Sequence, residues 1–285
     1  MPDMEEAMPS IKILLITLIS LMLSNPVLSF AEVRNEYYPS GELEAERNFK
    51  NDKLDGISKL YFESGELRVE VSYKNGKVEG IVKSYYKSGK LQGEANYKNG
   101  MREGIRKDYY ENGQLQEEAN YKNGKGDGIV KSYYKSGKLQ GEANYKNGRR
   151  EGIRKDYYES GQLQREENYE KGMRKGIRKD YYENGQARFE ANYKNGKKKG
   201  IARSYYKSGK LNTEIFYKKN KAEGSAKLYY ENGQLRQEAN YKNDMREGIL
   251  KSYYKNGGIK KIKTYKNYRL IAVKEYDENG KLLKE

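Results

Sequence analysis

The chain has no histidine, cysteine or tryptophan among its 285 residues. It therefore lacks thiol and imidazole nucleophiles, the commonest general base and the usual ligands of zinc. It also has no cysteine for a disulfide or for a lipid anchor. Only four prolines accompany 30 glycines, which fits a regular series of turns better than a proline-rich linker. These absences leave neither a catalytic centre, nor a cofactor, nor a metal site to be expected.

Apolar residues are also scarce. Hydrophobic residues make up 35% of the chain and charged residues 34%, proportions that by themselves indicate disorder. Tyrosine changes that expectation, because the chain has 30 tyrosines and aromatic rings bury large areas. All but Tyr268 and Tyr276 fall into three columns that repeat every 24 residues. The aromatic columns therefore predict a folded repeat array.

A period of 24 residues runs through the chain from about residue 35 onward. The clearest copy, residues 80–103, reads GIVKSYYKSGKLQGEANYKNGMRE. Nine glycines recur at this spacing: Gly56, Gly80, Gly104, Gly128, Gly152, Gly176, Gly200, Gly224 and Gly248. A repeat of this length sets the architecture before any local pattern does. Such chains are typically binding surfaces and rarely catalysts.

Two turn signals divide each unit into strands. In the copy above they are Ser88-Gly89 and Asn99-Gly100, and Asn-Gly suits the positive φ angles of a type I′ turn. The signals lie about 11 to 13 residues apart, which leaves room for one strand between them. We therefore expect an all-β fold, an elongated antiparallel meander of about ten stacked 24-residue β-hairpin repeats.

A two-residue loop at Ser88-Gly89 would fix the register of the hairpin. It pairs Tyr86 with Leu91, Val82 with Ala95, and Lys83 with Glu94. The core would be thin, with a leucine, an isoleucine and three aromatic residues from each unit. The glutamates in register with Glu94 are better explained as half of a Lys–Glu ladder than as catalytic carboxylates, because a glycosidase needs two singular carboxylates across a cleft.

The first 31 residues have a different composition. Residues 11–23 are strongly apolar, and small residues precede Ala31, a pattern typical of a signal peptide cleaved after Ala31. An uncleaved anchor is the alternative, although about 20 residues are needed to span a bilayer, and Met8 is a better start for a signal peptide than Met1. We expect residues 1–31 to be a signal peptide and 32–285 a single repeat domain, secreted or in the cell envelope.

The expected mature chain is strongly basic. Removing one lysine and three acids with residues 1–31 leaves 56 basic and 38 acidic residues, a net charge of +18. Such a chain is drawn to acidic lipids, anionic polysaccharides or acidic proteins. Alternatively, lysine only keeps a long sheet soluble and blunts its edges. Export argues against nucleic acid as the ligand, although tyrosines among lysines resemble a stacking platform.

The segment after each Asn-Gly turn varies between units and forms one edge of the predicted meander. This edge is most basic in the later units, where the candidate binding residues are Arg149, Arg150, Arg174, Lys175, Lys197, Lys198 and Lys199. The alternative is an ordinary solvated row of turns.

The unit G-I-x-K-x-Y-Y-x-x-G-x-L-x-x-E-x-x-Y-K-N-G resembles the MORN repeat in its bacterial variant form, over about residues 35–285. The resemblance implies stacked β-hairpins in an elongated, twisted sheet. Bacterial chains of this kind are often named YwqK-like antitoxins, and the eukaryotic repeats look like membrane-docking or scaffolding modules. Departures from the pattern occur at Lys171-Gly172, Ala187, Asn220, Asp244 and Tyr268. Residues 258–285 look like a degraded C-terminal cap.

Two functions follow from these expectations. The first is an exported, non-enzymatic repeat scaffold that binds proteins or anionic envelope or membrane components. The second is an antitoxin-like or immunity protein that neutralises a toxin partner. Self-association through exposed sheet edges is compatible with either.

Overall fold

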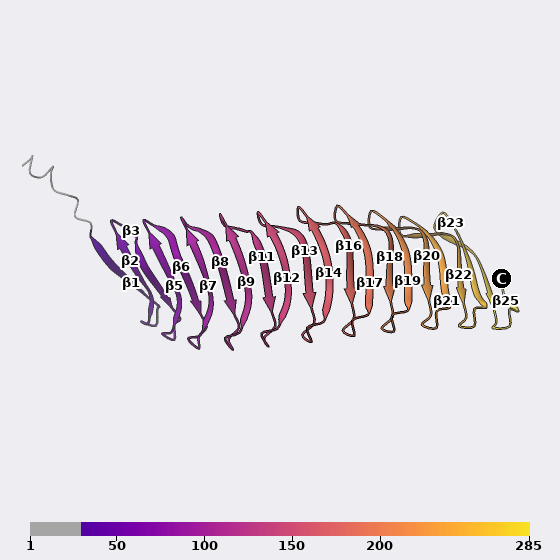
Figure 1. Cartoon of the computed structure of the whole chain (residues 1–285), viewed down its shortest axis with the longest axis horizontal. Coiled ribbons are helices and arrows are strands. Elements are labelled where there is room, and N and C mark those ends of the chain that lie inside the picture. Colours follow the sequence, from indigo (N-terminus) through magenta and orange to yellow (C-terminus); the bar gives the residue numbers. More distant parts are fainter. Residues whose placement is uncertain (1–29) are drawn as a thin grey trace, which may run out of the picture.

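The computed structural model describes residues 30–285, which form one antiparallel sheet of 25 strands without a helix. The strands lie side by side in chain order, from β1 at one end to β25 at the other (Figure 1). The predicted all-β elongated meander is confirmed. The predicted signal peptide lies outside the described residues except for its last two positions. No helix within residues 30–285 is long and apolar enough to cross a membrane.

The strands recur in pairs along the sheet. Their bounds are β1 Ala31–Tyr37, β2 Leu43–Lys50, β3 Lys53–Leu54, β4 Gly56–Tyr61, β5 Leu67–Lys74, β6 Lys77–Tyr85, β7 Leu91–Lys98, β8 Met101–Tyr109, β9 Leu115–Lys122, β10 Lys125–Gly126, β11 Gly128–Tyr133, β12 Leu139–Lys146, β13 Arg149–Tyr157, β14 Leu163–Glu170, β15 Met173–Arg174, β16 Gly176–Tyr181, β17 Ala187–Lys194, β18 Lys197–Tyr205, β19 Leu211–Lys218, β20 Lys221–Tyr229, β21 Leu235–Lys242, β22 Met245–Tyr253, β23 Ile259–Lys266, β24 Arg269–Tyr276 and β25 Leu282–Lys284. In three units the nine-residue strand is broken by one residue, giving β3 and β4, β10 and β11, and β15 and β16.

The Asn-Gly turns have the predicted conformation. Asn99 and Gly100 have φ angles of 52° and 81°, and Lys98 pairs with Met101, as a two-residue type I′ turn requires. Later units keep this turn where glycine is replaced. Asn220 and Asp244 have φ angles of 73° and 70°, a region that these two residue types tolerate better than most.

The Ser-Gly loops differ from the prediction. The amide of Gly89 donates to the carbonyl of Tyr86 at 2.9 Å, and the amide of Tyr86 donates to the carbonyl of Lys90 at 2.9 Å. The loop therefore contains three residues, with Gly89 in the left-handed region at φ 76°. Tyr85, not Tyr86, pairs with Leu91, and a bulge restores the register one residue further on. The predicted Tyr86–Leu91 pair is wrong.

The rest of the predicted register is confirmed. Val82 pairs with Ala95 and Lys83 with Glu94, and Glu94 also pairs with Lys107 of the next hairpin. Basic and acidic residues thus alternate across neighbouring strands in one row, the Lys–Glu ladder. It runs through Glu46, Lys59, Glu70, Lys83, Glu94, Lys107, Glu118, Lys131, Glu142, Lys155, Glu166, Lys179, Glu190, Arg203, Glu214, Lys227, Glu238 and Lys251.

The two faces of the sheet carry different residues. The ladder face holds the Lys–Glu ladder and a row of isoleucines, which are half exposed; Ile81 is 47% and Ile129 56% exposed. The expectation that isoleucine contributes to the core is therefore wrong. The opposite face, the tyrosine face, holds the buried row of small residues, including Ala119 and Ala191, and the tyrosine column of Tyr97. The row also takes larger side chains in some units, such as Leu250 and Glu167, which are likewise buried.

Tyrosine hydroxyls also connect successive hairpins. The hydroxyl of Tyr86 donates to the backbone carbonyl of Tyr109 in the next unit at 2.7 Å. The same bond recurs at every step along the sheet, from Tyr38 to Tyr254 with one exception at Phe62, where the hydroxyl is missing. Each unit is therefore held by its neighbours, as expected of a repeat array in which no unit buries its own core.

Candidate functional site

The predicted basic residues all lie along the edge of the sheet that is formed by the two-residue turns. Arg149 and Arg150 begin β13, Arg174 ends β15, and Lys197 to Lys199 begin β18; Lys175 follows β15 directly. The structure thus brings the seven candidates to one edge, at the starts of three successive long strands.

Three of the candidates turn onto the tyrosine face. The guanidinium of Arg150 donates to the hydroxyl of Tyr145 at 3.1 Å and lies 5.4 Å from the ring centre of Tyr169. The guanidinium of Arg174 lies 5.6 Å from the Tyr193 ring, and the Lys198 ammonium lies 4.3 Å from the Tyr217 ring. These cation–π contacts make the three side chains part of the packing of the tyrosine face. The other four, Arg149, Lys175, Lys197 and Lys199, are exposed.

Further lysines join three of the exposed candidates, Lys175, Lys197 and Lys199, on the same edge. Together they form what we call the lysine edge, which consists of Lys171, Lys175, Lys194, Lys197, Lys199, Lys218, Lys219 and Lys221. Of these eight lysines, only Lys175 has a carboxylate oxygen of the described residues within 4.0 Å of its ammonium nitrogen, that of Glu170 at 2.8 Å. The hydrogen bond from Lys175 lowers the pKa of Glu170. The lysine edge is therefore an exposed strip of nearly uncompensated positive charge.

A row of carboxylates accompanies the two-residue turns elsewhere on this edge. The carboxylate of Glu79 accepts a hydrogen bond from the amide of Asn99, the first residue of the next turn, at 2.7 Å. The residue before the column glycine makes the same contact in six units, through Asp55, Glu79, Glu103, Asp127, Glu151 and Glu223, at 2.7–3.2 Å. In a seventh unit Glu247 accepts from the amide of Tyr268, the second residue of the next turn, at 3.2 Å. We call this contact the turn clamp, because it joins each turn to the next.

The turn clamp is missing from two adjacent units of the lysine edge. Lys175 and Lys199 occupy the position of the clamping carboxylate. The amides of Asn195 and Lys219, which would be the donors, have no acceptor among the described residues. Beside Asn195 lies an open depression of about 230 Å³, which is also lined by Lys171, Arg174, Lys175 and Glu170. In these two units the edge thus presents a backbone amide without an acceptor and a lysine ammonium group. In the clamped units the same amide is already bound to a carboxylate.

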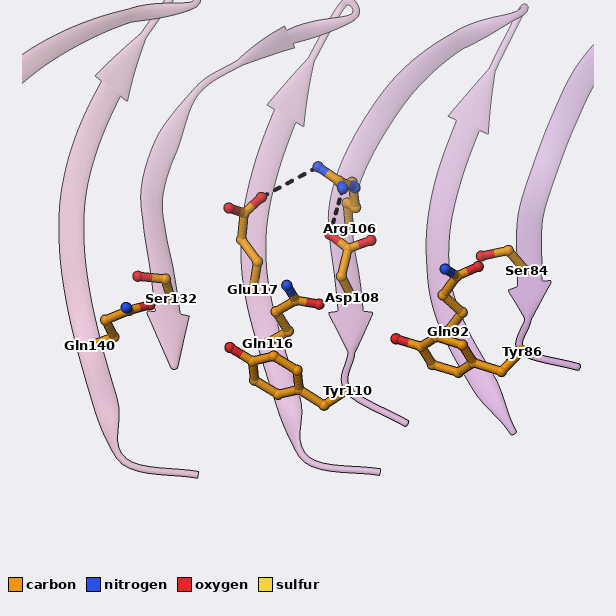
Figure 2. A pocket seen from close by; sticks show the side chains of 10 residues that line it. All are labelled: Ser84, Tyr86, Gln92, Arg106, Asp108, Tyr110, Gln116, Glu117, Ser132 and Gln140. Carbon is orange, nitrogen blue, oxygen red and sulfur yellow. Dashed lines mark hydrogen bonds and ion pairs between the residues drawn. The ribbon is translucent and has the colours of Figure 1, made fainter. Parts of the chain in front are cut away.

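The tyrosine face carries a second candidate region, a polar depression of about 400 Å³ (Figure 2). Arg106 lines it and contacts Asp108 at 2.5 Å on its own strand and Glu117 at 3.3 Å on the neighbouring strand. Figure 2 shows Tyr86 and Tyr110 lining the depression from equivalent positions of two units. Because the one positive charge of Arg106 meets two carboxylates, the charged residues that line the depression leave a net charge of only −1.

Buried ion pairs continue this pattern into the middle of the sheet. Asp180, 2% exposed, accepts hydrogen bonds from Arg165 at 2.9 Å and Arg178 at 2.7 Å. Burial by itself would raise the pKa of Asp180, but the two arginines outweigh it and lower the pKa. Glu167, 1% exposed, is held in the same way by Tyr169 and Arg174, and its pKa is also lowered. The sequence analysis missed this network, because its members come from four different columns of the repeat. Glu167 and Arg178 replace the alanine and valine of other units, whereas Asp180 and Arg165 replace serine and glycine.

No group of three or more acidic residues within residues 30–285 is arranged to hold a metal ion. On the ladder face, the hydroxyl of Tyr253 donates to Glu238 at 2.6 Å; burial and this carboxylate raise the pKa of Tyr253 to about 12. Such a tyrosine stays protonated at neutral pH and acts as a hydrogen-bond donor. The arrangement suits binding along an edge or a face.

Comparison with known proteins identifies the repeat. The family model described as "MORN repeat variant" matches eleven consecutive segments, at residues 33–51, 54–75, 78–99, 102–123, 126–147, 150–171, 174–195, 198–219, 222–243, 246–267 and 271–285. The resemblance deduced from the repeat unit is thereby confirmed. No match to the sequence was found among curated proteins.

Two solved structures align with most of the chain at low similarity. One is the crystal structure of TcdB2-TccC3-Cdc42, with 11% identity and a TM-score of 0.17; the other is TcdB2-TccC3 without its hypervariable C-terminal region, with 12% identity and a TM-score of 0.19. In both cases 88% of this chain is aligned, but it spans only 17% of the other chain. TM-scores this low establish no common fold.

Proposed function

Because the chain belongs to the MORN repeat variant family, we propose that it is an exported, non-enzymatic scaffold that binds a protein partner or an anionic surface along its lysine edge. Repeats of this family generally mediate binding to proteins or membranes. The single observation that carries the proposal is the uncompensated charge of the lysine edge, where neighbouring units have turn clamps instead. Acidic lipids, anionic polysaccharides and acidic proteins are the classes of partner that fit it.

Electrostatic binding along this edge is testable with reversed charges. We would titrate the protein with poly-L-glutamate and with vesicles containing phosphatidylglycerol, at low and at physiological salt. Lys197 and Lys221 are replaced by Glu in one variant, and Lys207 and Lys210, on the opposite edge, in the control, so that both variants undergo the same change in net charge. Loss of binding in the first variant alone supports the proposal. Equal loss in both variants, or none in either, contradicts it.

Export is the second part of the proposal. It rests on the apolar run at residues 11–23 and on the small residues before Ala31. In its support, β1 begins at Ala31, so cleavage there removes no more than the first residue of the sheet. Fractionation of the native host and the intact mass of the recovered protein test it. A chain beginning at Glu32 in the envelope or medium supports export, and an unprocessed cytoplasmic chain contradicts it.

The alternative function is that of an antitoxin-like or immunity protein, which would occupy a toxin through the same lysine edge. The edge favours it only if the toxin presents an acidic surface. An unprocessed chain in the cytoplasm would make this alternative the stronger one.

A further inference from the structure

The turn clamps show which chemical group the edge is built to hold. In seven units a carboxylate oxygen lies 2.7–3.2 Å from the amide of the next turn. The same amides at Asn195 and Lys219 are without an acceptor in the described chain, and the residues in the clamp positions are Lys175 and Lys199. A carboxylate of a binding partner would meet the same amide donor at these two turns. A lysine ammonium would lie nearby, where the other units have the protein's own clamping carboxylate.

We propose that these two units form a two-point site for an acidic peptide segment, in which one carboxylate binds at Asn195 and a second at Lys219. This inference rests on the proposed function of the lysine edge and specifies its partner. Charge-assisted hydrogen bonds from a backbone amide to a carboxylate are among the stronger ones. The depression of about 230 Å³ beside Asn195 provides room for the first carboxylate and its stem.

The distance between the two points determines which backbone conformation of the peptide can reach both. Equivalent turns are separated by two strands, which is about 9.4–9.8 Å at the usual spacing of a sheet. A polyproline II segment has three residues per turn and rises about 3.1 Å per residue, so its residues i and i+3 lie on one side about 9.3 Å apart. In a β-strand, by contrast, residues i and i+3 point to opposite sides. The site therefore fits acidic residues at every third position of a polyproline II segment.

One side chain of the protein competes for the first point. Glu170 lies in the depression beside Asn195 and forms an ion pair with Lys175 at 2.8 Å. Other units have lysine at the position of Glu170, as at Lys146 and Lys194. Lys199 has no such partner within residues 30–285, so the point at Lys219 is the more accessible of the two. Removal of the Glu170 carboxylate should strengthen peptide binding.

The test compares two peptides of equal charge on the intact protein. One contains five Glu-Pro-Pro units and the other five Glu-Pro units, so that only the spacing of the glutamates differs. Isothermal titration at low salt should show that the wild-type protein binds the first about tenfold more tightly, since one charge-assisted hydrogen bond is worth about that factor. Lys199→Glu restores the clamp and should abolish the preference. Lys221→Glu removes the same charge beside the site and should retain it.

A variant that binds the peptide more tightly distinguishes the two-point site from a general effect of net charge. Glu151 clamps the amide of Lys171, so Glu151→Lys should open a third point and tighten binding of the Glu-Pro-Pro peptide about fivefold or more. Glu159→Lys, on the opposite edge, makes the same change in charge without freeing a turn amide. The units with Lys175 and Lys199 show that the sheet accommodates lysine at the clamp position.

The outcomes are distinguishable from those of the proposed function. Equal affinity for the two peptides, or equal effects of Lys199→Glu and Lys221→Glu, overturns the two-point site while the anionic edge stands. Binding to phosphatidylglycerol vesicles with no binding to either peptide also overturns it and assigns the edge to membranes. If the wild-type protein binds neither peptide nor vesicle, both the inference and the proposed function fail.

Discussion

The carboxylate of Glu79 accepts a hydrogen bond from the backbone amide of Asn99 across the gap between two successive turns, at 2.7 Å. This contact joins two hairpins at their tips, beside the backbone hydrogen bond that the amide of Gly100 donates to the carbonyl of Val78 at 2.8 Å. A contact between a carboxylate and an amide of the next turn recurs in seven units, where it stabilises the edge. It is missing from the two units of Lys175 and Lys199, where the edge is available to a partner.

Removal of one turn clamp should loosen the neighbouring turn. We expect Glu79→Ala to lower the free energy of unfolding by about 0.5–1 kcal/mol, since the bond is charge-assisted but solvent-accessible. Because a repeat array transmits such effects mainly to neighbours, the amide of Asn99 should exchange with solvent faster than distant turn amides do. Glu111→Ala, which removes a bond to Ser88 on the opposite edge, is the control. Unchanged exchange at Asn99 would contradict the clamp.

A buried hydroxyl without a partner should be dispensable. Ser58 is fully buried, and its hydroxyl is the one buried side-chain polar atom of residues 30–285 that lacks a hydrogen bond. It occupies the row in which other units have valine or alanine, and it pairs with Val71. We expect Ser58→Ala to raise the free energy of unfolding by about 1 kcal/mol, because leaving such a group unsatisfied costs about 1–3 kcal/mol.

The matched control for this prediction is a hydroxyl that has a partner. Ser204 and Thr213 share a hydrogen bond of 2.7 Å, so Ser204→Ala should destabilise the protein. Urea denaturation of both variants measures the difference. The same sign of change in Ser58→Ala and Ser204→Ala would refute the explanation.

The buried carboxylate of Asp180 should make stability depend on pH. Its pKa is lowered in the folded protein by Arg178 and Arg165, which outweigh the opposing effect of burial. A lowered folded pKa contributes stability that is fully present above the ordinary value of about 4 and is lost as the pH falls through the folded value. Asp180→Asn should therefore cost about 2–4 kcal/mol at pH 7, because it leaves partly buried arginines without their partner.

The cost of Asp180→Asn should shrink as the pH is lowered below about 4, because the carboxylate is protonated first in the unfolded wild-type chain and only at lower pH in the folded protein. Urea denaturation of both proteins at pH 7 and pH 3 measures this change. A difference in stability that stays constant over this range would show that the carboxylate charge contributes nothing.

Tyr253 should be among the last tyrosines to ionise. Burial, and then the hydrogen bond to Glu238, raise its pKa to about 12. Glu238→Gln removes the negative charge and should lower the pKa of Tyr253, whereas Glu231→Gln, on the Ser-Gly edge beside Ser208, should leave it unchanged. Carbon NMR of labelled tyrosine between pH 9 and 12 follows the titration. An unchanged pKa in Glu238→Gln would contradict the assigned hydrogen bond.

Periodicity was sufficient to predict most of the fold. Asn99-Gly100 defines its turn because both residues accept positive φ, and the Lys83–Glu94 register follows from the alternation of side chains along a strand. The loop at Gly89 was predicted one residue too short, since Ser-Gly also fits a three-residue loop followed by a bulge. A bulge leaves no composition signal, and it shifts the partner of Leu91 by one residue.

The site was less accessible to sequence reasoning. The basic character of Lys197 to Lys199 was evident, but only the structure shows that Lys198 lies over the Tyr217 ring while its neighbours are exposed. The turn clamp had a visible signal, an acidic residue before most column glycines. The hydrogen-bond partner of that acidic residue is a turn amide 20 residues away, as for Glu79 and Asn99. The pattern within one strand does not predict such a partner.

Zero-length cross-linking tests the central claim most directly, because a carbodiimide joins a carboxylate only to an amine in contact with it. The protein would be treated with carbodiimide in the presence of the Glu-Pro-Pro peptide, and the linked lysines would be located by mass spectrometry. The account predicts links concentrated at Lys175, Lys199 and Lys219. Links spread equally to Lys87, Lys135 and Lys207 on the opposite edge would show that the lysine edge is not a binding site.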